Sequence, residues 1–117
     1  KNKNKNKNII NIGSNSTKTL NASNLLYIAS KASIESYTKS LAKSYGDQVR
    51  VNCVSPGLMK TKTTNLSKEN RFKYVIDKTS LKRLCYPKDI FDCIISIIDK
   101  MKFLNGEVIK IDGGRTL

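Results

Sequence analysis

Two residues of the chain, Tyr27 and Lys31, have the types and spacing for acid–base chemistry. They are four positions apart in a stretch without Pro or Gly, so on a helix their side chains share one face about one turn apart. An ammonium group beside a phenol stabilises the phenolate, which makes Tyr27 a credible proton donor near neutral pH. A lone Tyr-x-x-x-Lys pair also occurs by chance on many half-exposed helices, so further residues must support the assignment.

A third polar side chain, Ser14, follows a short apolar run. Residues 9–13 (IINIG) are rich in β-branched side chains and end at a glycine, which predicts a buried strand running into a loop. Side chains at the carboxyl edge of a parallel sheet face the crevice in which such folds bind ligands. We therefore expect the Ser14 hydroxyl to be able to hold a substrate carbonyl oxygen beside Tyr27.

The composition excludes other kinds of chemistry. The chain has no histidine, which rules out Ser-His-Asp and Cys-His catalysis and His-ligated zinc. Its three cysteines, Cys53, Cys85 and Cys93, fit neither a disulfide framework nor a metal knuckle, so we expect buried, reduced thiols in an intracellular protein. The longest nearly apolar stretch, residues 91–98, is far shorter than the roughly 20 residues of a membrane span. These features predict a soluble, cytoplasmic protein without a metal site or a membrane partner.

The net charge of +13 at first suggests a nucleic-acid partner. Residues 1–8 (KNKNKNKN), however, supply four of the lysines and are predicted to form a low-complexity tail ahead of a domain over residues 9–117. No zinc-finger spacing or alternation of basic and aromatic residues is present. An AT-rich genome would also enrich Lys, Asn and Ile together. The sequence therefore does not favour nucleic-acid binding.

The elements that must position the three polar residues alternate along the chain. Residues 24–45 predict a long helix ending at Gly46, residues 49–57 (VRVNCVSPG) a second strand, and residues 106–114 (GEVIKIDGG) a last strand. A helix is predicted to start at Pro87 with Asp89 in its first turn, and residues 61–82 predict a polar segment with one short helix over 68–77. This order predicts an α/β fold with three parallel strands and right-handed crossovers.

Apolar periodicity predicts which helix faces are buried. The long helix has apolar or aromatic residues at mostly helical intervals, with a second side of small residues, and the helix after Pro87 carries one apolar face. The expected apolar positions are Leu26, Ile34, Tyr37, Leu41 and Tyr45 on the first, with small Ala29, Ala32, Ser33 and Ser36, and Ile90, Ile94, Ile95, Ile98 and Met101 on the second.

Taken in order, the motifs IINIGS, YIASK, RVNCVSPGLMKT, RLCYPKDI and GEVIKIDGG resemble the short-chain dehydrogenase/reductase family. They look most like its 3-oxoacyl-[acyl-carrier-protein] reductase branch, with fatty acid synthesis as a candidate pathway. The resemblance implies a Rossmann-type doubly wound sheet, an NAD(P) cofactor, and a small-molecule or carrier-linked carbonyl substrate. It also implies a homo-oligomer, assembled through the long helix and through the last helix and strand.

The resemblance implies a role for each matching residue. Ser14 would orient the substrate carbonyl, Tyr27 would donate the proton, and Lys31 would hold the nicotinamide ribose, while the cofactor supplies a hydride. Residues 61–82 would form a substrate lid, Asn52 would be structural near the end of the second strand, and residues 112–114 would form a turn, structural in our preferred interpretation. The further implied cofactor contacts are Pro56, Gly57, Met59 and Thr61.

The family's glycine-rich phosphate-binding loop has no counterpart in the chain, whose six glycines lack its spacing. We therefore expect a carboxyl-terminal half of a Rossmann-type fold whose first strand is an exposed edge, and a chain that alone is weakly active or inactive. NAD and NADP are not distinguished, because the residue that would read the 2′ position is in the other half. Two alternatives stay open: a noncatalytic remnant or interaction module, and, less favoured, a basic nucleic-acid-binding protein.

Overall fold

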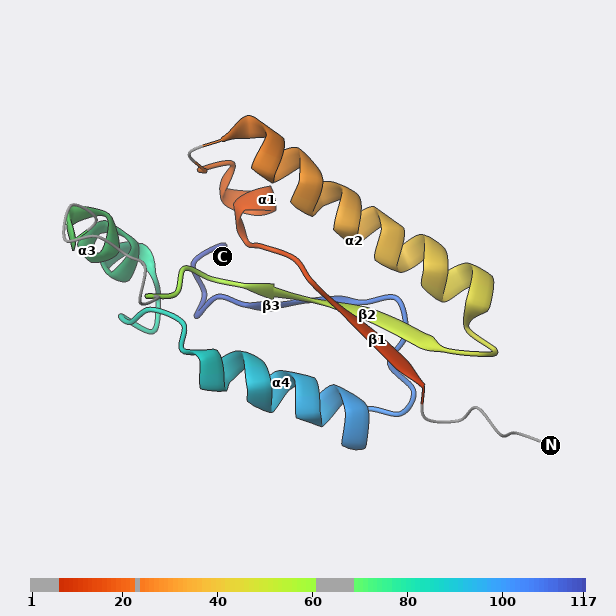
Figure 1. The fold of residues 1–117 in the computed structure, drawn as a ribbon. Coiled ribbons are helices and arrows are strands. Elements are labelled where there is room, and N and C mark those ends of the chain that lie inside the picture. Colours follow the sequence, from red (N-terminus) through yellow and green to blue (C-terminus); the bar gives the residue numbers. More distant parts are fainter. Residues whose placement is uncertain (1–6, 23, 61–68) are drawn as a thin grey trace.

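The structure, a computed structural model, describes residues 7–22, 24–60 and 69–117, which form a three-stranded parallel sheet between helices (Figure 1). The strands β1 (Asn8–Ile12), β2 (Arg50–Pro56) and β3 (Val108–Ile111) lie side by side in chain order. Both pairings are parallel, with Asn8 opposite Arg50 and Cys53 opposite Val108. The predicted α/β fold is confirmed, and β1 begins one residue earlier than expected.

The central strand β2 supplies much of the core. Its residues from Val51 to Pro56 are all buried, as expected for a strand paired on both edges and covered by α2 (Leu25–Tyr45) and α4 (Pro87–Asp99) on its two faces (Figure 1). Val54 forms a buried cluster with Ile90 and Ile97 of α4. By contrast, β1 is an edge strand whose Ile9 and Ile12 are exposed. This corrects the buried strand that the apolar run predicted, and it agrees with the exposed edge expected for half of a Rossmann-type fold.

Helix α2 has the predicted limits. Asn24 caps its amino end by accepting a hydrogen bond from the Leu26 backbone N–H at 2.8 Å, and Gly46 follows its last residue. The predicted buried face is only half correct. Ile34 and Leu41 are half-buried, but the exposed residues include Leu26, Tyr37 and Tyr45, and the small residues Ala29, Ala32, Ser33 and Ser36. Thr38 and Ala42 are buried instead, because their small side chains let α2 lie close to the sheet.

Helix α4 begins as the sequence predicted. Pro87 occupies the first turn, and the Asp89 carboxylate accepts a hydrogen bond from the Tyr86 backbone N–H at 2.8 Å. Arg83 pairs with the same carboxylate at 2.7 Å. Both contacts lower the pKa of Asp89, which falls to about 2, and the hydrogen bond from Arg83 has the larger effect.

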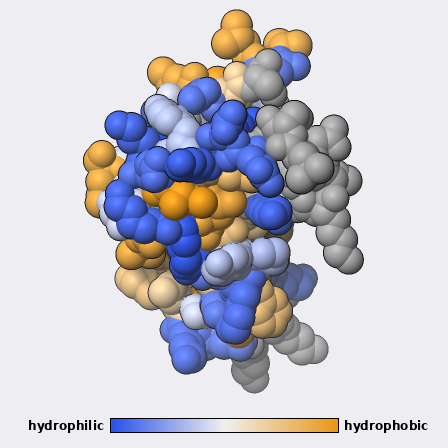
Figure 2. Space-filling model, turned by 90° about the vertical axis from the view of Figure 1, so that its left-hand side faces the viewer, coloured by the Kyte–Doolittle hydropathy of each residue, from blue (hydrophilic) through white to orange (hydrophobic). Residues whose placement is uncertain are grey.

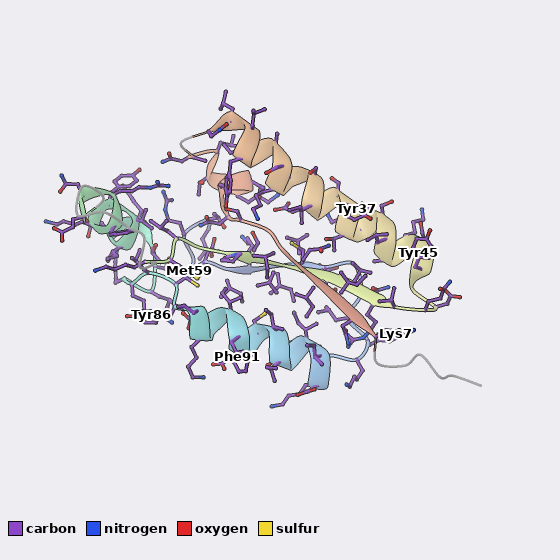
Figure 3. All side chains as sticks on the ribbon, viewed as in Figure 1. Lys7, Tyr37, Tyr45, Met59, Tyr86 and Phe91 are labelled. Atoms are coloured by element: carbon purple, nitrogen blue, oxygen red, sulfur yellow. The ribbon has the colours of Figure 1, made fainter. Side chains whose placement is uncertain are left out.

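The predicted apolar face of α4 needs one correction. Ile97 is completely buried although the pattern did not single it out, whereas Ile95 and Met101 are exposed. Phe91, also exposed, lies on the side of α4 away from the sheet (Figure 3). The apolar stripe is therefore rotated toward Ile90 and Ile97, because the sheet contacts only part of a helix that is apolar over a wide arc.

Two further helices lie near the carboxyl edge of the sheet. The four-residue helix α1 (Ser16–Thr19) was not predicted, whereas α3 (Glu69–Lys78) confirms the short helix expected over residues 68–77. Residues 61–68 of the predicted lid, including Thr61, lie outside the described residues. In the part of the chain that is described, no helix is long and apolar enough to cross a membrane.

Polar residues fix the connections around β3. Asn52 is fully buried, and its carboxamide donates to the Leu104 carbonyl at 3.2 Å and accepts from the Glu107 N–H at 3.0 Å. It is the predicted structural residue, although it lies near the start of β2. Asp112 closes the last turn by accepting from the Gly114 N–H and the Thr116 hydroxyl, at 3.1 and 2.6 Å.

The three thiols are free in the structure. Cys53 is fully buried in β2, as expected, whereas Cys85 and Cys93 are only partly buried. Burial is the main cause that raises the pKa of each of these thiols above its ordinary value. None of the three is therefore an activated nucleophile.

Candidate functional site

A cavity of about 390 Å³ lies at the carboxyl ends of β1 and β2. Its walls come from the segments that follow these strands, from α1 and the start of α2, and from α3 and the segment after β3. It brings together six of the residues singled out in the sequence: Ser14, Tyr27, Lys31, Pro56, Gly57 and Met59. Thr61, the seventh, is not among the described residues.

Parallel pairing continues past the end of β1 and fixes Ser14 at the cavity. The Gly13 N–H donates to the Val54 carbonyl at 2.8 Å, and the Asn15 N–H donates to the Pro56 carbonyl at 3.0 Å. A Cβ atom on Gly13 would lie 2.9 Å from the Cys53 sulfur, so only glycine permits this close approach. The Ser14 hydroxyl oxygen accepts from the Ser16 N–H at 3.2 Å, which leaves its own hydrogen available to a ligand.

Helix α2 presents Tyr27 and Lys31 to the same cavity. The Lys31 ammonium nitrogen lies 5.7 Å from the centre of the Tyr27 ring and donates to the Ile12 carbonyl at 3.0 Å. The hydrogen bond to Ile12 joins α2 to the last residue of β1. Since an ammonium carries three hydrogens, two are left to bind hydroxyl groups in the cavity.

A hydrogen bond between side chains joins α1 to α2 near the site. The Thr17 hydroxyl lies 2.7 Å from a carboxylate oxygen of Glu35 and 3.1 Å from the Ser14 carbonyl, and it can donate to either. One turn further along α2, Asn11 of β1 donates its amide to the Thr38 hydroxyl at 2.9 Å. Strand β1 and the loop after it are thus held to the helix that carries Tyr27.

The segment after β2 forms another wall. The Gly57 N–H donates to the Ile111 carbonyl at 2.9 Å, and a Cβ on Gly57 would lie 3.1 Å from the Asp112 Cα. A larger residue at this position would therefore crowd the backbone just after β3. Met59 pairs as an isolated bridge with Cys85, and it lies just beyond the end of β2 (Figure 3).

The cavity also contains residues that sequence reasoning missed. Tyr74 and Val75 of α3 line it together with Arg115, whose guanidinium carbon lies 5.9 Å from the centre of the Tyr74 ring. The position of Arg115 directly after the paired glycines 113 and 114 is a signal that could have identified it. Arg71, which the sequence placed only among the basic residues of the lid segment, lines the cavity too.

The lining suits the nicotinamide end of a dinucleotide better than the whole molecule. The two remaining Lys31 hydrogens can bind ribose hydroxyls, and the cavity is near the lower end of the roughly 300–1,000 Å³ typical of small-molecule sites. The glycines stand at positions 13, 46, 57, 106, 113 and 114, so none forms the phosphate-binding fingerprint. Tyr27, Lys31, Pro56, Gly57 and Met59 are the lining residues that could hold the nicotinamide and its ribose.

Comparison with known proteins gives consistent matches over nearly the whole chain. A family model described as enoyl-(acyl carrier protein) reductase matches residues 1–116. The short-chain dehydrogenase/reductase homolog YusR of Bacillus subtilis is 34% identical over 93% of this chain and 83% of its own length. Carbonyl reductase family member 4 of Danio rerio is 33% identical over 93% of this chain but only 45% of its own length.

Solved structures agree in fold. A short-chain dehydrogenase/reductase from Brucella melitensis superposes with a TM-score of 0.86 at 30% identity, over 94% of this chain and 45% of that protein. A 4-hydroxyisoleucine dehydrogenase complexed with NADH gives a TM-score of 0.84 at 34% identity, over 93% and 46% of the two chains. The chain thus spans less than half the length of these structures and of the Danio rerio relative.

Proposed function

Because the chain belongs to the short-chain dehydrogenase/reductase family, we propose that it reduces a carbonyl group, or oxidises the corresponding alcohol, with a nicotinamide dinucleotide. One observation carries the proposal. Ser14 from the loop after β1 and Tyr27 and Lys31 from α2 line a single cavity at the carboxyl edge of a parallel sheet. Ligands of open α/β folds bind at this edge.

The contacts of each side chain support its role in carbonyl reduction. Ser14 donates its free hydroxyl hydrogen to the substrate carbonyl oxygen, which can only accept, while the Ser14 oxygen accepts from the Ser16 N–H. Tyr27 donates the proton that the oxygen takes up. Lys31 holds the ribose hydroxyls with the two hydrogens that the Ile12 carbonyl does not use. A bound reduced nicotinamide would supply the hydride.

Relatives support the proposed cofactor class and the general type of substrate. One neighbour is complexed with NADH and another, a blue fluorescent protein from a metagenomic library, with NADPH. Relatives include a 3-oxoacyl-[acyl-carrier-protein] reductase of Chlamydia pneumoniae and a 7alpha-hydroxysteroid dehydrogenase of Bacteroides fragilis. For this chain we propose NAD or NADP, a small-molecule or carrier-linked carbonyl substrate, a homo-oligomer, and residence in the cytoplasm. We propose neither a nucleic-acid nor a membrane partner.

The experiment that tests the proposal compares Tyr27→Phe with Tyr37→Phe, a matched control at an exposed position on the same helix. Oxidation of NADH, NADPH and reduced nicotinamide mononucleotide is followed by absorbance with a set of carbonyl compounds. The mononucleotide is included because the cavity fits that part of the cofactor. We expect Tyr27→Phe to lower turnover by a factor of ~100 or more, and Tyr37→Phe to leave it unchanged.

A binding measurement tests the proposed cofactor site even when turnover is too slow to follow. Fluorescence of the reduced mononucleotide is titrated with the wild-type chain and with Lys31→Met, which removes the ribose-binding ammonium. The wild type should bind it, and the variant should bind at least ~10-fold more weakly. Measurable turnover that is equal in wild type and Tyr27→Phe, or failure of the wild-type chain to bind the reduced mononucleotide, would refute the proposed function.

A further inference from the structure

The charged side chains that line the cavity are all positive. Lys31, Arg71 and Arg115 take part in the lining, and no Asp or Glu does among the described residues. Figure 2 looks onto the end of the molecule at which α3 lies, and hydrophilic side chains there surround an apolar area. A cavity with cations and no carboxylates concentrates anions, because the positive potential is not cancelled locally.

The fold brings the two arginines to the cavity from distant parts of the sequence. Arg71 lies on α3, and Arg115 follows the turn after β3. The end of α3 is fastened to that turn, since the Leu81 N–H donates to the Gly113 carbonyl at 3.1 Å and the Ser80 hydroxyl to the Gly114 carbonyl at 3.3 Å. These contacts hold together the two segments that carry the arginines.

The arginines are not used by ion pairs within the described part of the chain. The pairs found there are Arg83 with Asp89 and Lys88 with Asp92. The guanidinium carbon of Arg115 lies 5.9 Å from the centre of the Tyr74 ring, a cation–π distance at which its N–H groups stay available to a ligand. Guanidinium groups form bidentate hydrogen bonds with carboxylates and phosphates, which suits the two arginines to recognise an anion of either kind.

From this arrangement we propose that the carbonyl substrate is a small anion, an oxo acid or an oxo phosphate, whose charged group binds Arg71 and Arg115 while Ser14 and Tyr27 receive its carbonyl oxygen. The inference rests on the proposed function. The cofactor contacts proposed above come from α2 and the segment after β2, whereas the arginines come from α3 and the segment after β3. The cation pair is therefore assigned to the substrate.

The test measures binding without cofactor. The ¹⁵N-labelled chain is titrated by NMR with acetoacetate and with its neutral methyl ester, and with dihydroxyacetone phosphate and dihydroxyacetone. The anions should bind at least ~10-fold more tightly than their neutral partners. Arg71→Gln and Arg115→Gln should each remove most of that preference, and Lys73→Gln, which removes a charge from an exposed position of α3, should retain it. Whichever of the two anions binds more tightly shows whether the charged group of the substrate is a carboxylate or a phosphate.

Three results would overturn the inference. One is equal binding of anion and neutral partner to the wild type. Another is a loss of reduced nicotinamide mononucleotide binding in the arginine variants as large as their loss of acetoacetate, which would assign the arginines to the cofactor phosphate. The third is a dependence on Arg71 and Lys73 alike that is seen only with a substrate attached to an acidic carrier protein, which would indicate a protein-docking surface.

Failure of the proposed function is recognised separately. Reduction of the neutral methyl ester by the wild type and by both arginine variants, abolished by Tyr27→Phe, supports the oxidoreductase whatever the anion measurements show. Anion binding by a chain that neither binds the reduced mononucleotide nor shows Tyr27-dependent reduction would instead contradict the proposed function and, with it, the assignment of the anion as a substrate.

Discussion

Replacement of Arg50 by Met tests how the end of α4 is fixed to the sheet. Arg50 is the first residue of β2, and its guanidinium donates to the carbonyls of Met101, Leu104 and Ile97 at 2.7, 3.2 and 3.1 Å. These carbonyls lie at or just beyond the carboxyl end of α4, where backbone acceptors lack partners within the helix. A cation at this end also interacts favourably with the helix dipole.

The expected loss follows from these contacts. The Leu104 carbonyl keeps a second donor, the Asn52 amide, and the Met101 carbonyl keeps the Leu104 N–H, so among the described residues the substitution leaves only the Ile97 carbonyl without its donor. At about 1 kcal/mol for that bond and about 0.5 kcal/mol for the dipole, the free energy of unfolding should fall by about 1.5 kcal/mol. For a chain of this length that corresponds to a decrease in Tm of roughly 6 °C.

The assay is urea denaturation followed by circular dichroism, with thermal unfolding as a second measurement. Arg50→Met should lower the midpoint at an unchanged slope, and Arg50→Lys, which keeps the charge but not the planar fork, should lose about half as much. Lys39→Met, which removes one positive charge from an exposed site on α2, serves as the control. A loss for Arg50→Met no larger than for Lys39→Met would refute the reasoning.

Three further predictions concern other contacts. The pKa of Asp89 is lowered to about 2, so its ionised form stabilises the fold above about pH 4, and this contribution is lost as the pH falls toward 2; the acid dependence of stability should be weaker in Asp89→Asn, and an unchanged dependence would contradict it. Gly113→Ala should lower the free energy of unfolding by about 1–3 kcal/mol, because the residue has a φ of +61° and its Cβ would lie 2.9 Å from the Thr79 methyl carbon. An unchanged Tm would show that alanine causes no backbone strain or clash at this position. Native Cys53, buried and with a raised pKa, should resist alkylation until the chain unfolds, as mass spectrometry of the labelled peptides would show, and rapid labelling in the folded protein would argue against its burial.

The order and type of the main elements could be read from the sequence. β-Branched runs, the absence of Pro and Gly over residues 24–45, and Pro87 at a helix start are local signals, and each depends on backbone preferences over a few residues. The three predicted strands and the helices α2, α3 and α4 are accordingly present. The four-residue α1 escaped prediction because it is shorter than one period of an apolar pattern.

Helix faces were predicted less well, because periodicity shows that a helix has an apolar side but not which part of it meets the sheet. Thr38 is completely buried on α2, whereas Tyr37 beside it is exposed. On α4 the same uncertainty separated buried Ile97 from exposed Ile95. Each outcome depends on how close the helix lies to β2, which no local pattern specifies.

The sequence by itself determined the alternation of strands and helices and the placement of Ser14 after a strand, with Tyr27 and Lys31 one turn apart on a helix. Only the tertiary structure decided that Arg71 and Arg115 share their cavity. Spacing along a chain constrains neighbours within one element, whereas residues on α3 and after β3 line one cavity because hydrogen bonds join the segment after α3 to the glycine turn.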